Sequence, residues 1–239
     1  MKLKKINQVL QEALIDCGLT EANELQKETF SVIKSGADAI IASEGGSGKS
    51  TTIVINVIQQ LICEGEESPR ALIFVEDKAK VLEMEELFEK FGKFTNLRVF
   101  GVHEKGDMEY DKNYISAGID VLIGTPVKLS DMFSTAGYNV NRLKMFIVDD
   151  ADSILKLRHE TKIMRISNSI TKTQRIVFTD QFTERVEILT DKMLIEPFVF
   201  DYNEEYEEED DEDLEEEESV LHSIDDFEEE DEEIDDDEE

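Results

Sequence analysis

The sequence predicts a three-layer α/β domain built on a mainly parallel sheet, followed by an acidic tail. Short apolar runs rich in β-branched residues alternate with segments whose apolar residues recur at helical spacing. Most of these runs are apolar almost throughout, which is typical of strands buried on both faces of a parallel sheet. Acidic residues gather at the carboxyl end. We therefore expect a doubly wound body over residues 1–202 and a disordered tail over residues 203–239.

Six strands are expected along the body, at residues 37–42, 71–75, 97–102, 121–124, 145–149 and 175–179. The segments between them are long enough for the crossover helices that parallel strands require. In one such segment, a single helix face would carry five apolar residues: Val81, Met84, Leu87, Phe88 and Phe91. This alternation of strand and helix indicates the doubly wound arrangement.

Charge separates the tail from the body. The chain holds 58 acidic and 25 basic residues, and 26 of the acidic residues lie in the last 37 positions, which contain no Lys or Arg. Like-charge repulsion and few apolar groups prevent such a segment from forming a core. The tail could be a solubilising segment, an RNA mimic that covers a basic face near Lys78, Lys80 and Lys128, or a dock for basic proteins. The residues leave these three interpretations open.

The composition also argues against several classes of protein. The body has 32 acidic and 25 basic residues, and this net negative charge is unfavourable for tight, sequence-independent binding to DNA. No run of 18 apolar residues occurs, so we expect no membrane span. Cys17 and Cys63 are the only cysteines and cannot form a disulfide framework. Reduced thiols and a cytoplasmic location are expected.

The sharpest motif is SEGGSGKST at residues 43–51, between an expected strand and an expected helix. Its glycines let backbone N–H groups converge on an anion, and the helix N-terminus adds partial positive charge. Lys49 would reach the β and γ phosphates of a nucleotide, and the Ser50 hydroxyl would bind Mg²⁺. The alternative is a Gly/Ser-rich surface loop, since Ser43 replaces the first glycine of the strict pattern GxxxxGK[ST]. The expected nucleotide-binding residues here are Ser43, Gly45, Gly46, Ser47, Gly48, Lys49, Ser50 and Thr51.

A phosphate-binding loop predicts an acidic residue after a second strand, where it would hold the metal. The segment KMFIVDDAD supplies Asp149 and Asp150 at the end of such a strand. Asp149 would bind Mg²⁺, usually through water. Adjacent acidic residues after a strand are also common in solvated loops. The pair therefore indicates a metal site only in combination with the SEGGSGKST loop. ATP and Mg²⁺ are therefore the expected cofactors.

Taken together, these motifs resemble the first RecA-like domain of a DEAD-box RNA helicase, from near residue 6 to residue 201. GLTEANELQ is similar to the family's Q motif, SEGGSGKS to AxTGSGKT, and VDDAD to the DEAD motif itself. ALIFVEDKAK stands where the family has a strand followed by PTREL, GTPVKL resembles the element TPGR, and IVFTD stands where the SAT motif would be. The resemblance implies an ATP-dependent domain that binds RNA.

The resemblance also implies roles for particular residues. Gln26 would contact adenine, because a primary amide can pair one donor and one acceptor with the edge of that base. Lys49 and Asp150 would be the catalytic residues, Asp150 in place of the glutamate that orients the attacking water. Its carboxylate is one methylene shorter, a displacement of about 1.5 Å that is large enough to slow the reaction.

Three residues would face RNA by the same resemblance: Lys78, Thr125 and Lys128. Both lysines replace arginines, so they keep the charge but lose the bidentate geometry of a guanidinium. The Q motif and the SAT motif also depart from the family's pattern, at Ala22, Asn23 and Glu24 and at residues 179–181, respectively. No stretch of the 239 residues resembles the family's second RecA-like domain, whose arginine fingers contribute on the order of 10³–10⁵ in rate.

The expected function is therefore that of a domain that binds ATP·Mg²⁺ and RNA, with weak or partner-dependent ATP hydrolysis and no autonomous unwinding. A second RecA-like domain acting in trans could supply the arginine fingers. The alternative is a non-catalytic nucleotide-binding adaptor whose acidic tail docks a basic partner protein.

Overall fold

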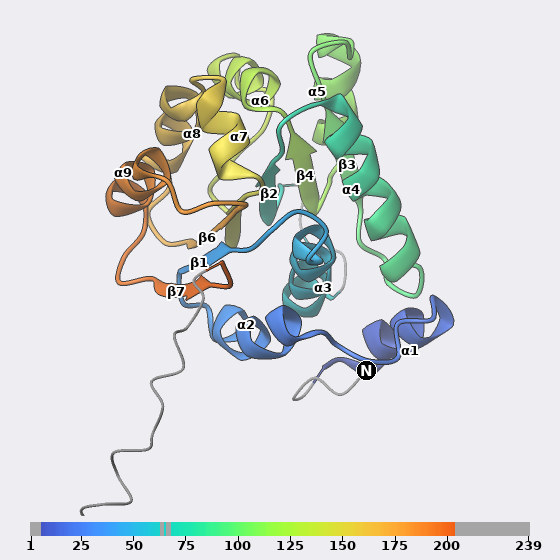
Figure 1. The fold of residues 1–239 in the computed structure, drawn as a ribbon. Coiled ribbons are helices and arrows are strands. Elements are labelled where there is room, and N and C mark those ends of the chain that lie inside the picture. Colours follow the sequence, from blue (N-terminus) through green and yellow to red (C-terminus); the bar gives the residue numbers. More distant parts are fainter. Residues whose placement is uncertain (1–5, 63–64, 66–67, 204–239) are drawn as a thin grey trace, which may run out of the picture. The chain divides into compact units, whose positions relative to one another are not determined.

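Seven strands form one sheet in the described part of the computed structural model, residues 6–62, 65 and 68–203 (Figure 1). They are β1 (Ala39–Ala42), β2 (Ala71–Phe74), β3 (Val99–Val102), β4 (Val121–Gly124), β5 (Met145–Val148), β6 (Gln174–Thr179) and β7 (Phe198–Asp201). Their order is β3-β4-β2-β5-β6-β1-β7, and every neighbouring pair is parallel. The predicted RecA-like α/β fold is confirmed.

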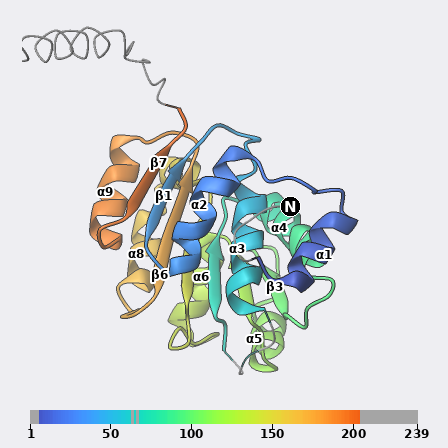
Figure 2. The same cartoon turned by 90° about the horizontal axis from the view of Figure 1, so that it is seen from below.

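Helices cover both faces of the sheet, as Figure 2 shows from below. One group consists of α1 (Gln8–Asp16), α2 (Glu24–Ser35), α3 (Lys49–Leu61) and α4 (Lys78–Phe91). The other consists of α5 (Met108–Ser116), α6 (Pro126–Ser134), α7 (Ala151–Lys156), α8 (Glu160–Ser167) and α9 (Glu184–Met193). The three layers enclose two hydrophobic cores, one on each face.

Alternation along the strands builds both cores from the same short runs. Successive side chains of a strand point to opposite faces, so Ile41 packs with α1–α4, whereas Ile40 packs with α5–α9. This explains why the strands are apolar throughout rather than at every second position. The helix face predicted between β2 and β3 lies on α4. Its residues Val81, Met84, Phe88 and Phe91 are buried, and Leu87 packs partly buried against the same core.

Six of the seven strands match the sequence predictions in place, whereas β7 is not among them. This strand pairs with β1 alone, at the edge of the sheet. Its first two side chains, Phe198 and Val199, are more than half exposed. β7 therefore lacks the buried environment of the inner strands, although β3, at the opposite edge and also only partly buried, is among the predicted strands.

The chain divides into two units, Met1–Glu204 and Glu205–Glu239. The second unit lies outside the described residues, as does all of the predicted acidic tail except Asn203. Within the described ranges, no helix is both long enough and apolar enough to cross a membrane.

Candidate nucleotide-binding site

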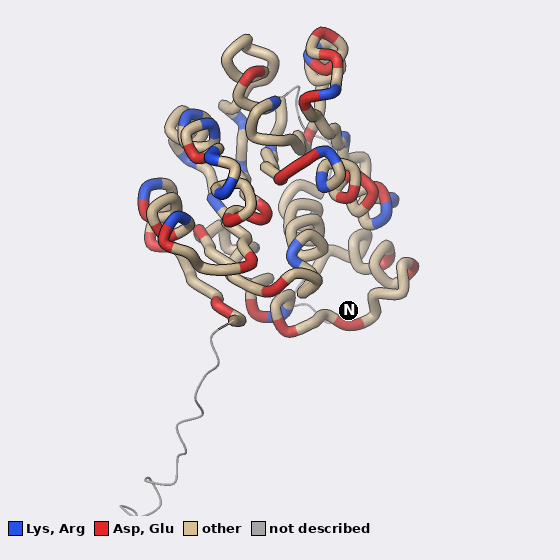
Figure 3. Tube along the Cα trace, turned by 45° about the horizontal axis from the view of Figure 1, so that its top comes forward, with Lys and Arg blue, Asp and Glu red and all other residues tan. Residues whose placement is uncertain are grey.

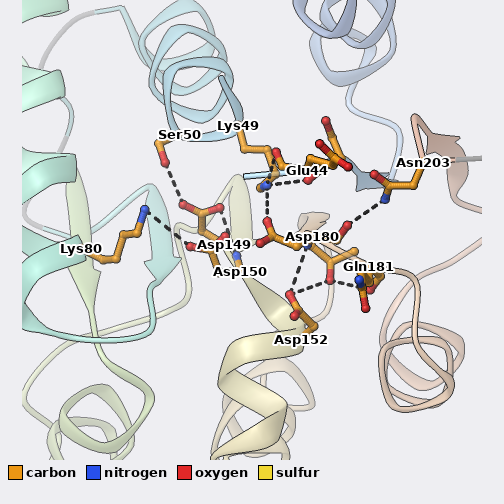
Figure 4. A network of polar contacts seen from close by, with 12 residues as sticks. Glu44, Lys49, Ser50, Lys80, Asp149, Asp150, Asp152, Asp180, Gln181 and Asn203 are labelled. Atoms are coloured by element: carbon orange, nitrogen blue, oxygen red, sulfur yellow. Dashed lines mark hydrogen bonds and ion pairs between the residues drawn. The ribbon is translucent and has the colours of Figure 1, made fainter. Parts of the chain in front are cut away.

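The site lies where the carboxyl ends of the strands meet, which is the usual place for ligands in open α/β sheets. Figure 4 shows side chains from the segments after β1, β2, β5 and β6 gathered at this edge. The strand register explains the convergence, because the last residue of β1, Ala42, pairs with the last residue of β6, Thr179. In the same way Phe74 at the end of β2 pairs with Val148 at the end of β5.

The loop at residues 43–48 joins β1 to α3. Gly46 and Gly48 have φ angles of 85° and 96°, a left-handed conformation that residues with a Cβ atom rarely adopt. The backbone N–H of Ser43 donates to the carbonyl of Thr179 at 3.0 Å, which ties the start of the loop to β6. Helix α3 begins at Lys49, so its first N–H groups, including those of Ser50 and Thr51, face this edge of the sheet. The loop therefore has the shape and polarity that suit a phosphate.

Asn23 and Gln26 hold the start of α2 against this loop. They form a capping box, in which Asn23 Oδ1 accepts from the N–H of Gln26 at 2.9 Å and Gln26 Oε1 accepts from the N–H of Asn23 at 3.2 Å. Asn23 Nδ2 donates to the carbonyl of Ser47 at 2.7 Å. A Cβ atom on Gly48 would lie 3.1 Å from Asn23 Nδ2 and 3.5 Å from Gln26 Nε2, so Gly48 also allows this close approach. The predicted adenine-binding glutamine thus adjoins the phosphate loop.

The Lys49 side chain is buried, and its ammonium group makes three contacts within the chain. Nζ donates to the carbonyls of Ser43 at 2.6 Å and Glu44 at 3.1 Å, and it forms an ion pair with Asp180 Oδ1 at 2.5 Å. An ammonium group has three N–H donors, so these contacts use all of them. Any phosphate bound by Lys49 must replace at least one of these partners.

Ser50 and the acidic pair after β5 meet at the centre of the site (Figure 4). Ser50 Oγ donates to Asp149 Oδ2 at 3.2 Å, and Asp149 is buried. Asp149 Oδ1 accepts from the N–H of Asp150 at 3.1 Å. The carboxylate of Asp150 lies 3.8 Å from Nζ of Lys80, which extends from α4. The structure thus brings together Ser50 and Asp149, the two residues expected to bind Mg²⁺.

The environment raises the pKa of all three groups, Asp149, Asp150 and Lys80, for different reasons. Burial and the neighbouring carboxylate of Asp150 raise the pKa of Asp149 to about 7. Burial also raises the pKa of Asp150, although Lys80 and Lys49 act against it. For Lys80, partial burial would lower the pKa, but the carboxylates of Asp150 and Glu83 outweigh it and raise the pKa. The acidic pair is therefore costly to keep charged unless cations lie beside it.

The three residues expected at RNA occupy different environments. Lys78 is exposed at the start of α4, and Thr125 caps α6 at the end of the neighbouring strand β4. Thr125 is only 1% exposed, and Lys128 is only 3% exposed. Its Nζ lies 2.8 Å from Asp111 Oδ2 and donates to the carbonyl of Gly106 at 2.9 Å. The geometry does not support the predicted contact of Lys128 with RNA, because a buried partner on α5 satisfies its charge.

Three charged residues of the site were not predicted from the sequence: Lys80, Asp152 and Asp180. Asp152 accepts from Thr179 Oγ1 at 3.1 Å and from the N–H of Asp180 at 3.2 Å, which joins α7 to the end of β6. Asp180 reaches Lys49 across the loop, and Lys80 reaches Asp150. The available signal was an acidic residue directly after a strand, the same pattern that identified Asp149.

The donor set of the site fits ATP with Mg²⁺. Mg²⁺ usually keeps several waters and takes one or two protein oxygens beside those of the phosphates. Ser50 Oγ and Asp149 Oδ2 provide such a pair. The described residues hold no group of three or more His, Cys, Asp or Glu side chains that could bind a metal. The buried Ser47 Oγ has no hydrogen-bond partner among the described residues, so the loop keeps one polar atom for a ligand.

The fold and this loop define the class of the protein. A parallel sheet with helices on both faces, a glycine-rich loop that opens α3, and an acidic residue at the end of β5 are the features of a P-loop NTPase domain.

Comparison with known proteins then gives the family. The family model described as DEAD/DEAH box helicase matches residues 23–187, and the chain belongs to this family. Its relatives include the ATP-dependent RNA helicase eIF4A of Eremothecium gossypii, which is 25% identical over 194 residues, 81% of this chain and 49% of the relative. The ATP-dependent DNA helicase DDX31 of Homo sapiens is 30% identical over 190 residues, 75% of this chain and 22% of the relative. The chain thus spans less than half of the length of these relatives.

Proposed function

We propose that this chain binds ATP·Mg²⁺ through its phosphate loop and engages RNA beside that site. Residues 1–202 would form the ATP-binding domain, and the acidic residues 203–239 would form a separate tail. Lys49 and the loop from Ser43 to Thr51 would bind the phosphates, Ser50 and Asp149 would hold Mg²⁺, and Gln26 would contact adenine. Membership of the DEAD/DEAH box helicase family supports these assignments. The cytoplasm is the proposed location.

One observation carries the proposal: Lys49, Ser50 and Asp149 converge at one edge of the sheet. They come from segments about 100 residues apart in sequence, and yet Ser50 Oγ and Asp149 Oδ2 lie 3.2 Å from each other. The same edge holds the left-handed glycines of the loop. The alternative, a Gly/Ser-rich surface loop, does not account for the buried Asp149 beside the N-terminus of α3.

RNA would be bound next to this site. Lys78 and Thr125 follow β2 and β4, which lie side by side, and the N–H of Val75 donates to the carbonyl of Gly124 at 3.1 Å. Lys78 is exposed and would contact a phosphate. Lys128 is left out of this proposal because it is paired with Asp111.

Hydrolysis would be slow or dependent on a partner. Asp150 stands where the family has glutamate, and its carboxylate lies against Lys80. Arginine fingers, which contribute on the order of 10³–10⁵ in rate, would come from a second RecA-like domain acting in trans. Autonomous unwinding is therefore not expected of these 239 residues.

A second candidate function is a nucleotide-binding adaptor without turnover. The ion pair Lys80–Asp150 favours it, because it engages the carboxylate that hydrolysis would need to orient the attacking water. In this case the acidic tail would dock a basic partner protein, and nucleotide binding would serve recognition alone.

The test is ATP binding and steady-state hydrolysis by the purified chain, with and without single-stranded RNA. We expect Mg²⁺-dependent ATP binding, and we expect Lys49→Ala to abolish it. The matched control is Lys172→Ala, which removes an exposed lysine before β6, at the opposite edge of the sheet. Its ATP binding should equal that of the wild type.

The outcomes separate the two candidates. RNA-stimulated turnover that Lys49→Ala removes would support the ATPase. Binding with turnover at background, even with RNA, would support the adaptor. A wild-type chain that binds no ATP would contradict both.

A further inference from the structure

The carboxylate of Asp180 forms an ion pair with the ammonium group of Lys49, which would bind nucleotide phosphate. Of the three partners of Lys49, two are backbone carbonyls and only Asp180 is a side chain (Figure 4). The Lys49 side chain is 6% exposed, whereas that of Asp180 is 45% exposed. The acidic partner therefore sits on the open side of the phosphate loop, where a ligand would arrive.

The surroundings fix the backbone of Asp180 and leave its side chain exposed. Its N–H donates to Asp152 Oδ1 at 3.2 Å, and its carbonyl accepts from Asn203 Nδ2 at 2.8 Å. A Cβ atom on Gly45 would lie 3.8 Å from Asp180 Oδ2, so the carboxylate lies directly over the loop. With its backbone held from both sides, Asp180 can give way to a ligand only by turning its side chain.

We propose that Asp180 is an internal competitor of nucleotide phosphate and that it sets the affinity of the site according to phosphate number. This inference rests on the proposed function, since it concerns the same loop. A carboxylate and a phosphate both accept hydrogen bonds from Lys49 and both carry negative charge. They cannot share its ammonium group without repulsion, so binding requires the Lys49–Asp180 pair to break.

The competition depends on which phosphates reach Lys49. A P-loop lysine contacts the β and γ phosphates. ATP must therefore displace Asp180 most completely, ADP less so, and AMP, which has neither phosphate, not at all. Asp180 acts as a positioning and specificity-determining residue that disfavours the triphosphate relative to the monophosphate.

The experiment measures the Kd of ATP, ADP and AMP for the full chain and for Asp180→Asn and Asp180→Ala, with Mg²⁺ present. We expect both variants to bind ATP about 10-fold more tightly, a change in keeping with loss of one charge-assisted contact to Lys49 and of its repulsion. ADP binding should tighten less, and AMP binding should not change. Asp180→Glu retains the charge and should stay within about two-fold of the wild type, since the competing interaction remains.

Asp191→Asn is the matched control. It removes one negative charge from an exposed position in the last turn of α9, the helix that leads from the end of β6 back to the start of β7. Its nucleotide affinities should equal those of the wild type. Thermal unfolding without nucleotide establishes that each variant is folded, and if Asp180→Ala is not, the isosteric Asp180→Asn and charged Asp180→Glu pair still decides the question.

The possible results separate this inference from the proposed function. ATP binding that is equal or weaker in Asp180→Asn, while Lys49→Ala still abolishes binding, would overturn the role of Asp180 and leave the nucleotide site standing. Equal tightening for AMP and ATP would also overturn it, because the effect would not follow phosphate number. If neither the wild type nor any Asp180 variant binds nucleotide, the proposed function itself fails.

Discussion

Asp150 shows how the backbone selects a residue at the centre of the site. It caps the N-terminus of α7 with φ 49° and ψ 50°, in the left-handed region. Among residues with a Cβ atom, Asp and Asn adopt this conformation most readily, because their short polar side chains bond locally. Its carboxylate is also within 3.8 Å of Lys80. A short acidic side chain is thus suited to this position, even though the family's pattern has glutamate.

Replacing Asp150 with glutamate should raise hydrolysis and lower stability. The added methylene would carry the carboxylate about 1.5 Å further toward the attacking water, and we expect turnover with ATP and RNA to rise about 10-fold. The less favourable left-handed backbone should cost about 1 kcal/mol in the free energy of unfolding. Phosphate release and urea unfolding measure the two effects. The control is Asp191→Glu. Turnover unchanged by Asp150→Glu would show that the distance between the carboxylate and the attacking water does not limit the reaction.

Lys49 and Lys128 mark the limit of prediction at this scale. The role of Lys49 depends on a local motif, and the loop, its glycines and the start of α3 all lie where SEGGSGKST predicts. The surroundings of Lys128 depend on Asp111, which is 17 positions away and belongs to another helix. Such a pairing leaves no local pattern, and neither does the contact of Lys49 with Asp180. The phosphate loop could therefore be predicted from its local motif, whereas the acidic partners of Lys49 and Lys128 could not.

At the level of elements, one buried carboxylate joins three neighbouring strands at their amino ends. Asp120 is fully buried just before β4. Its Oδ1 accepts from Arg70 Nη2 at 2.8 Å, and its Oδ2 accepts from Arg98 Nε at 2.9 Å. Arg70 precedes β2 and Arg98 precedes β3, the two neighbours of β4 in the sheet. Burial would raise the pKa of Asp120, but the hydrogen bonds from Arg98, Gly65 and Arg70 outweigh it and lower the pKa.

Asp120→Asn should destabilise the domain by about 3 kcal/mol, since it leaves two arginines without their buried partner. The effect should depend on pH. Because the folded state holds the pKa below its ordinary value of 3.8, this stabilisation is present above that pH and is lost as the pH falls through the folded-state pKa. Urea unfolding at pH 7 and near pH 3 measures it, with Asp131→Asn on the exposed face of α6 as control. A difference between wild type and Asp120→Asn that grows toward low pH would contradict this account.

The same scale explains which strands could be predicted. A strand between two neighbours and two helix layers is buried at every position, and in β2 and β5 every residue is apolar. β6 is buried throughout as well, but it begins with Gln174 and Arg175, whose polar groups are hydrogen-bonded. The edge strand β7 meets β1 on one side only and leaves Phe198 exposed. An edge position does not by itself hide a strand, since β3 at the other edge was predicted. β7 differs in that Phe198 and Val199 are more than half exposed.

The distribution of charge concerns the whole molecule. Acidic and basic residues are interspersed over the helices of the described body (Figure 3), which carries a mild excess of negative charge. Residues 204–239 add 26 acidic side chains and no Lys or Arg. RNA binding requires phosphates to be neutralised by cations, so this charge opposes it wherever the segment lies within a Debye length, about 10 Å at 0.1 M salt.

Removing residues 204–239 should therefore strengthen RNA binding, and it should do so most at low salt. We expect the Kd for single-stranded RNA to fall about 10-fold near 50 mM salt and the gain to shrink as screening increases. Fluorescence anisotropy with labelled RNA across a salt series measures this. A chain of unchanged length with Asn and Gln in place of the Asp and Glu of this segment separates charge from chain length, and it should bind RNA as the shortened chain does. Equal affinities for all three proteins at low salt would assign the segment to solvation or to the docking of a basic partner, because only those roles leave the RNA site unaffected.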